Sequence, residues 1–159
     1  MAKFRLDEID HQILDMLIDN TRVPFTDIAK NLMISAGTVH VRVKKMEDAG
    51  IIMGSSLTLD YEKLGYSFIA YVGVYLHNTS QSKFVLERLK DLPFVTVAHV
   101  TTGKFNIFCK IRARDTQHAK DVIFAIDDIE GVYRTETMIS LEESINDKNR
   151  LMRTIFKNM

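Results

Sequence analysis

The sequence predicts an α+β protein in two parts, a helical N-terminal domain followed by a domain built on an antiparallel sheet. Over residues 7–50, apolar side chains recur at the spacing of amphipathic helices. From Ser67 onward, short apolar runs alternate with helical patterns in the order strand, helix, strand, strand, helix, strand. We therefore assign residues 1–60 to the helical domain, 61–142 to the sheet domain and 143–159 to a tail.

The first helix is expected from about Asp7 to Asn20. Asp7 suits the N-cap position, because a carboxylate there accepts hydrogen bonds from backbone amides that have no partner within the helix. The apolar stripe of this helix consists of Ile9, Ile13, Leu14 and Leu17.

Two further helices and a tight turn are expected at about residues 25–44, which is a helix-turn-helix. Thr26 is the expected N-cap of the shorter helix, and Asp27 lies in its first turn, where a negative charge suits the helix dipole. The second helix is expected to begin at Ser35, as its N-cap, and to end at Gly50. Its core-facing side consists of Val39, Val43 and Met46.

The positive charge of the chain is local. The 21 Lys and Arg residues balance 21 Asp and Glu residues, yet residues 28–46 contain four cations and no acid. Such a helix is suited to entering the major groove of DNA, where an exposed Val41 would contact a thymine methyl group. Modest local charge also implies that useful binding needs more than one subunit on the DNA. The expected DNA-binding residues are Ser35, Gly37, Thr38, His40, Val41, Arg42, Lys44 and Lys45.

Individual roles on this helix follow from side-chain chemistry. Ser35 and Thr38 are expected to contact phosphates, while His40, Val41 and Lys44 approach base edges. Arg42 and Lys45 are suited to either task. A winged helix that binds another protein is the alternative, and it would show no salt-dependent affinity for DNA. After this helix, Ile51, Ile52, Leu57 and Leu59 indicate a short hairpin or an extended wing.

The second domain is expected to have the ferredoxin-like order βαββαβ. Its strands are expected over 67–76, 94–101, 105–112 and 132–141, and its helices over 80–90 and 117–128. The inward residues of the first helix are expected to be Phe84, Val85, Leu86 and Leu89, and those of the second Ala119, Val122, Ile123 and Ile126. One face of the third strand is expected to carry Phe105, Ile107, Cys109 and Ile111.

The first strand of this domain, SFIAYVGVYL, has no polar face. Two helices cover only one side of such a sheet, so the other side needs a second cover, and the simplest is the same sheet of a second subunit. We therefore expect a homodimer with Val72 and Phe108 as candidate interface residues, one of which faces the partner sheet.

The tail carries Leu151, Met152, Ile155, Phe156 and Met159 at helical spacing. We expect an amphipathic helix docked on its own chain or on a partner. Arg150, Arg153 and Lys157 allow a second interpretation, in which the tail makes an additional DNA contact.

Several classes of protein are disfavoured. The single cysteine, Cys109, excludes an internal disulfide and suits a reducing cytoplasm. We expect no signal peptide, and no membrane span, because no apolar run is long enough to cross a membrane. His99 and His118 lack metal-ligand spacing, and no nucleophile is paired with a base, so neither an enzyme, nor a metal site, nor a cofactor is expected. We expect a cytoplasmic, nucleoid-associated protein.

The chain resembles the Lrp/AsnC family of transcription regulators over about residues 6–142. The resemblance rests on LDEIDHQILDMLIDNTRVPFTDIAKNL at 6–32, ISAGTVHVRVKKMEDAGII at 34–52, VAHVTTGKFNIF at 97–108 and GVYRTETMISL at 131–141. It implies a transcription regulator that binds DNA as dimers, assembles into octamers or other higher oligomers, and senses amino acids or related metabolites. It also implies an effector site at Thr102, Gly103, Lys104, Phe105, Asn106, Thr135 and Thr137.

The chain departs from the family in that loop. The family often has Gly-Asp-Tyr/Phe-Asp, where this chain has Gly103, Lys104, Phe105 and Asn106. Both acids are absent and a cation is added, which indicates either a more acidic ligand or no free amino-acid effector. Without an effector, the alternative is an architectural, nucleoid-like protein that coats DNA. The tail after residue 142 is also longer than the usual family ending.

Overall fold

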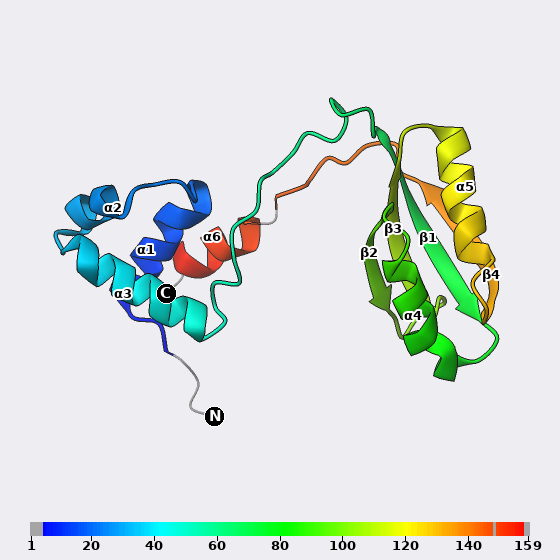
Figure 1. The fold of residues 1–159 in the computed structure, drawn as a ribbon, viewed down its shortest axis with the longest axis horizontal. Coiled ribbons are helices and arrows are strands. Elements are labelled where there is room, and N and C mark those ends of the chain that lie inside the picture. Colours follow the sequence, from blue (N-terminus) through cyan, green and yellow to red (C-terminus); the bar gives the residue numbers. More distant parts are fainter. Residues whose placement is uncertain (1–4, 148, 158–159) are drawn as a thin grey trace. The chain divides into compact units, whose positions relative to one another are not determined.

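A computed structural model describes residues 5–147 and 149–157. They form two compact units, which are described separately (Figure 1). Unit 1 consists of the described parts of Met1–Thr58 and Ile145–Met159, and unit 2 of Leu59–Ser144. Unit 2 is therefore inserted in the sequence between two segments of unit 1. No helix in the described part of the chain is long and apolar enough to cross a membrane.

Unit 1 is built on three helices: α1 (Glu8–Asp19), α2 (Phe25–Leu32) and α3 (Ala36–Asp48). Asp7 caps α1, as the sequence predicts, and it also forms a capping box with Asp10. The core combines apolar residues from all three helices, and Ile13, Ile28, Val39 and Met46 are completely buried in it.

The start of α2 differs from the sequence prediction. Pro24, and not Thr26, occupies the N-cap, and it makes no side-chain hydrogen bond. Proline lacks an N–H group and its φ of −61° is compatible with helix initiation, so the helix begins directly after it. The turn between α2 and α3 passes through Met33 at φ 54°, a left-handed conformation that β-carbon-bearing residues seldom adopt.

The segment after α3 is extended and contains no paired strand. The backbone turns at Gly50, where φ is +71°, and residues 52–60 have no regular secondary structure. Of the two alternatives expected from the sequence, the hairpin is absent and the extended form is present. The helix α6 (Arg150–Lys157) returns to unit 1 and lies against α1, where Asn149 Nδ2 donates to the Ile18 carbonyl at 3.3 Å. Met159, the last residue of its expected apolar stripe, lies outside the described residues.

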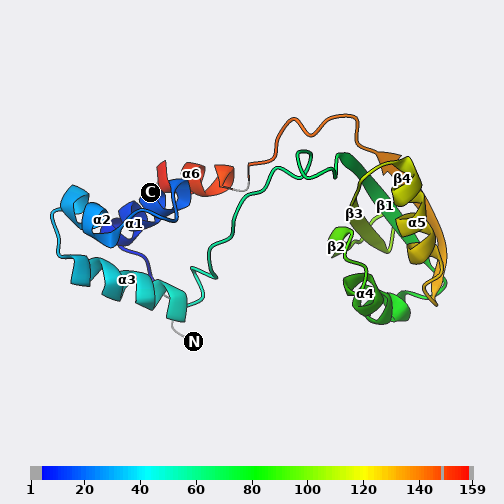
Figure 2. The same ribbon diagram turned by 45° about the horizontal axis from the view of Figure 1, so that its top comes forward.

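Unit 2 is a four-stranded antiparallel sheet with the order β2-β3-β1-β4. Its strands are β1 (Phe68–Leu76), β2 (Val95–Val100), β3 (Ile107–Ala113) and β4 (Val132–Ile139). The helices α4 (Ser82–Lys90), preceded by the short η1 (Thr79–Gln81), and α5 (Thr116–Asp127) lie on one face (Figure 2). This is the expected ferredoxin-like fold.

The core of unit 2 lies between the sheet and the two helices. Completely buried residues include Val72 and Val74 of β1, and Ile107, Cys109 and Ile111 of β3. Burial raises the pKa of the Cys109 thiol to about 12, so this cysteine is a core residue without a thiolate at neutral pH.

Two predicted core positions are wrong. Phe84 is 42% exposed, because α4 turns only Val85 and Leu89, four residues apart, fully toward the sheet. Phe105 does not share the face of Ile107, because β3 begins only at Ile107 and the Phe105 ring lies against Gly73 on the opposite face of the sheet.

Candidate DNA-binding and ligand-binding sites

The outward surface of α3 is the first candidate site. Ser35 caps the helix as predicted, and its Oγ accepts a hydrogen bond from the Thr38 amide at 3.0 Å. The two hydroxyl oxygens are 2.8 Å apart. Opposite the buried side of the helix, Gly37, Val41 and Lys45 form an exposed row at four-residue spacing, and Val41 is 53% exposed.

A surface hollow lies at this exposed row. It is lined by Arg5, Asp7, Asp10, Ser35, Gly37, Thr38, Val41, Arg42 and Lys45. Six of the eight residues expected to bind DNA therefore line this hollow, Arg42 among them. His40 and Lys44 do not line it, although both are exposed on α3.

Arg42 is engaged within unit 1. Its Nη1 is 2.7 Å from Asp7 Oδ2 and 2.8 Å from Asp10 Oδ1, which joins α3 to the start of α1. Asp10 is buried, and the ion pair accounts for this burial of a carboxylate. The pKa of Asp7 is lowered, first by the hydrogen bond from the Asp10 amide and then by the one from Arg42.

Lys44 has a partner on its own helix. Its Nζ is 3.0 Å from Asp48 Oδ1, and this hydrogen bond raises the pKa of Lys44. Both side chains are more than half exposed, so the pair can open at little cost.

The uncovered face of the sheet is the second candidate site. We call it the open face. Its central aromatic residues are Tyr71, Tyr75, Phe105 and Phe108, and adjacent rings along this group are 5.3–5.8 Å apart. Gly73 lies beneath the Phe105 ring, and a β-carbon there would be 2.3 Å from it. Phe108 is opposite Gly73 in the sheet and shares this face.

Val72 is not on the open face. It is opposite Cys109 and completely buried under the helices. Of the two candidate interface residues, Phe108 alone faces away from the helices, because neighbouring residues of a strand alternate between faces. The assignment of Val72 to an interface is therefore corrected.

A charged group lies beside the 102–106 loop at the edge of the open face. Lys104 Nζ is 2.6 Å from Glu136 Oε2, and the Tyr75 hydroxyl donates to Glu136 Oε1 at 2.9 Å. Arg134 Nη2 is 2.7 Å from the same Oε1. The hydrogen bond from Lys104 is the main cause of the lowered pKa of Glu136 and of the raised pKa of Lys104.

The expected effector residues divide between the two faces. Thr135 and Thr137 are opposite Val74 and Val72, and therefore lie on the helix-covered face, whereas Glu136 between them is opposite Gly73. Asn106 is used within the fold, because its Oδ1 accepts from the Leu76 amide at 2.9 Å. The sequence analysis missed Tyr75, Arg134 and Glu136. The alternation of side chains along the last strand could have identified Glu136, because it places Glu136 on the opposite face of the sheet from Thr135 and Thr137.

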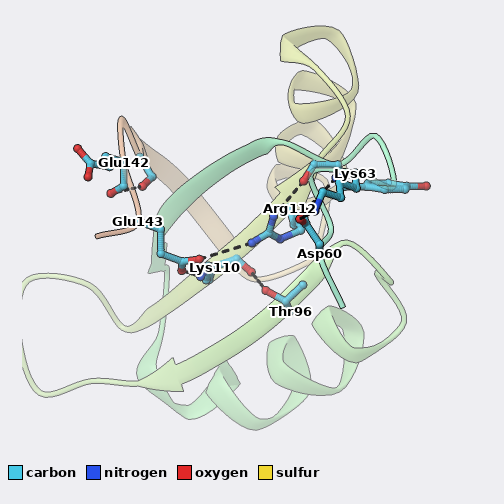
Figure 3. Close-up of polar contacts among 9 residues, drawn as sticks. Asp60, Lys63, Thr96, Lys110, Arg112, Glu142 and Glu143 are labelled. Atoms are coloured by element: carbon cyan, nitrogen blue, oxygen red, sulfur yellow. Dashed lines mark hydrogen bonds and ion pairs between the residues drawn. The ribbon is translucent and has the colours of Figure 1, made fainter. Parts of the chain in front are cut away.

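Both segments that connect unit 2 to unit 1 are attached to β3 (Figure 3). Arg112 Nη1 donates to the Tyr66 carbonyl at 2.9 Å in the incoming segment, and Arg112 lies over the Tyr61 ring. In the outgoing segment, Glu143 forms ion pairs with Lys110 and with Arg112. All three side chains of these ion pairs are largely buried: Glu143 is 21% exposed, Lys110 19% and Arg112 15%.

Comparison with known proteins identifies the families of both domains. Residues 6–53 match the family of winged helix-turn-helix DNA-binding domains, and residues 69–149 match the Lrp/AsnC ligand binding domain. The regulatory protein AsnC of Escherichia coli K12 is 35% identical over 156 residues, which cover 98% of this chain and 99% of AsnC. The match to AsnC therefore extends into the tail.

Solved structures agree with these matches. The structure of E. coli AsnC has a TM-score of 0.86 and 34% identity, and the match covers 90% of this chain and 97% of that one. A feast or famine regulatory protein of M. tuberculosis complexed with L-methionine has a TM-score of 0.83 over 91% and 97% of the two chains. At 24% identity, this structural match shows that the two proteins share a fold. The chain belongs to the Lrp/AsnC family and is a DNA-binding transcriptional regulator.

Proposed function

We propose that the protein reads specific DNA sequences through the exposed surface of α3. The observation that carries this proposal is the row Gly37, Val41 and Lys45, exposed beside the hydroxyls of Ser35 and Thr38. In this row, Gly37 allows the helix to approach the DNA closely, and Val41 can contact a thymine methyl group. Lys45 can contact a phosphate or a base edge.

The remaining residues of α3 have supporting roles in this proposal. His40 and Lys44 flank the row, and Lys44 reaches a base edge after leaving Asp48. Arg42, which the sequence suggested as a DNA contact, holds α3 against α1 through its ion pairs with Asp7 and Asp10.

Salt dependence tests the DNA contact. We expect Lys45→Ala to weaken binding to all duplexes and to flatten the plot of log affinity against log salt, by about 0.9 for each phosphate contact that is lost. Lys30→Ala is the matched control, because Lys30 is an exposed cation of α2 that does not line the hollow. Fluorescence anisotropy with a mixed-sequence duplex measures both slopes, and a parental slope for Lys45→Ala would contradict this role for Lys45.

We further propose that unit 2 binds a small metabolite with both a carboxylate and an ammonium group, such as an amino acid. The supporting group is the 102–106 loop with Tyr75, Arg134 and Glu136. Glu136 supplies the negative charge that the loop lacks, and Lys104 and Arg134 supply cations for a carboxylate. The methionine complex of the M. tuberculosis protein makes amino acids the first ligands to test.

Thermal unfolding tests this second proposal. A ligand that binds only the folded protein raises the unfolding midpoint, so each amino acid and several 2-oxo acids are added in turn. We expect one compound to raise the midpoint of the parent, and Glu136→Gln to reduce that shift when an ammonium group is recognised. Leu141→Gln, a substitution at an exposed residue outside this group, serves as control. If no compound shifts the midpoint, the protein binds DNA without an amino-acid effector.

A further inference from the structure

The segment that precedes α1 passes close to α3 (Figures 1 and 2). Its residues Arg5 and Asp7 line the hollow on α3. Two contacts fix this segment. Leu6 packs against the core of unit 1, and Asp7 both caps α1 and accepts a hydrogen bond from Arg42 of α3. The residue directly before them, Arg5, therefore lines the same hollow as Ser35, Thr38 and Lys45.

Arg5 determines the sign of the net charge of the residues that line the hollow. Among its lining residues, Arg42 is paired with two carboxylates, so this ion-pair group alone carries one excess negative charge. A negative group at a DNA-binding surface repels phosphates. Lys45 only balances that charge, and Arg5 makes the sum over the lining residues positive.

Arg5 is also available for a ligand. Its side chain is exposed, and within the part of the chain that the structure describes, no ion pair or hydrogen bond engages its guanidinium. Guanidinium groups bind phosphate oxygens through two parallel hydrogen bonds, which suits a contact with the DNA backbone.

We propose that Arg5 contacts a DNA backbone phosphate beside α3, and that the Arg42 ion pairs position the segment that carries it. The DNA-reading surface then includes residues from outside the helix-turn-helix. This inference rests on the proposed binding of DNA by α3.

The test compares Arg5→Ala, Arg5→Lys and Lys45→Ala with the parent, using the full-length protein, a mixed-sequence duplex and a salt series. We expect Arg5→Ala to flatten the salt slope by about 0.9 per subunit, as Lys45→Ala does, because each removes one phosphate contact. Arg5→Lys should restore most of the slope, since it keeps the charge. Lys30→Ala, outside the hollow, should retain the parental slope. All variants should keep the parental unfolding midpoint, because Arg5 is exposed.

The outcomes separate the two proposals. A parental slope for Arg5→Ala, together with a flattened slope for Lys45→Ala, overturns the role of Arg5 and leaves DNA binding by α3 intact. A parent protein whose affinity for the duplex does not depend on salt overturns both. A flattened slope for Arg5→Ala that Arg5→Lys restores supports the phosphate contact.

Discussion

The missing β-carbon of Gly73 allows the Phe105 ring to lie directly on β1. This contact takes Phe105 away from the helix-covered core and makes it part of the open face, next to Phe108 and Tyr75. Because the backbone of Gly73 has an ordinary strand conformation, the glycine is needed for space and not for a positive φ.

We expect Gly73→Ala to lower the free energy of unfolding by about 1–3 kcal/mol, because the added methyl group forces the ring or the strand to move. Gly103→Ala is the matched control. A β-carbon at Gly103 meets no atom within 4 Å, so we expect a change within about 0.5 kcal/mol. Urea unfolding measures both values, and equal effects for the two variants would refute the steric explanation.

At the scale of elements, the ion pairs of Arg42 join α3 to Asp7 and Asp10 at the start of α1. Arg42→Gln leaves the buried Asp10 without its cation, so we expect the free energy of unfolding to fall by about 1–3 kcal/mol. Asp10→Asn combined with Arg42→Gln should recover part of the loss, because the unpaired charge is removed. Lys44→Gln, which opens only an exposed pair on the same helix, should cost less than about 0.5 kcal/mol.

The same ion pairs predict the response to acid. The folded pKa of Asp7 lies below its ordinary value of 3.8, so its stabilising contribution is present above that value and is lost as the pH falls through the folded pKa. Unfolding measurements across this range should show a weaker acid dependence for Arg42→Gln than for the parent. Parallel curves would show that Arg42 does not lower the pKa of Asp7.

The sequence predicted the α-helices and strands of both units, because helical and strand periodicities are strong over residues 7–50 and 67–141 and apolar residues recur at helical spacing in the tail. It did not predict the short η1 that precedes α4. It failed where one residue departs from the local period. Phe105 was assigned to the face of Ile107 by strand alternation, but it lies before the start of β3. Thr135 and Thr137 were chosen because their hydroxyl groups could bind a ligand, but their register in β4 places them on the helix-covered face. Arg42 has the charge of a DNA contact, and only tertiary structure reveals its carboxylate partners.

At the scale of the whole molecule, the open face leaves a half-buried aromatic group without a cover from its own helices. We expect two copies to pair through this face, so Phe108→Asp should reduce the molar mass measured by light scattering to that of a monomer. Phe84→Asp, on the outer side of α4, should retain the parental mass. Circular dichroism checks that both variants are folded, and a folded Phe108→Asp variant with parental mass would contradict this interface.

The path of the chain has a mechanical consequence. Unit 2 is joined to unit 1 by two segments, residues near 59 and near 145, and Arg112 and Lys110 anchor the neighbouring parts of both to one strand. A domain on a single tether can spin freely about it, whereas a domain on two tethers must wind them around each other. Rotation of unit 2 about the two segments therefore twists them around each other, which limits that rotation. Cutting either segment alone would remove this limit while the other segment still joins the units.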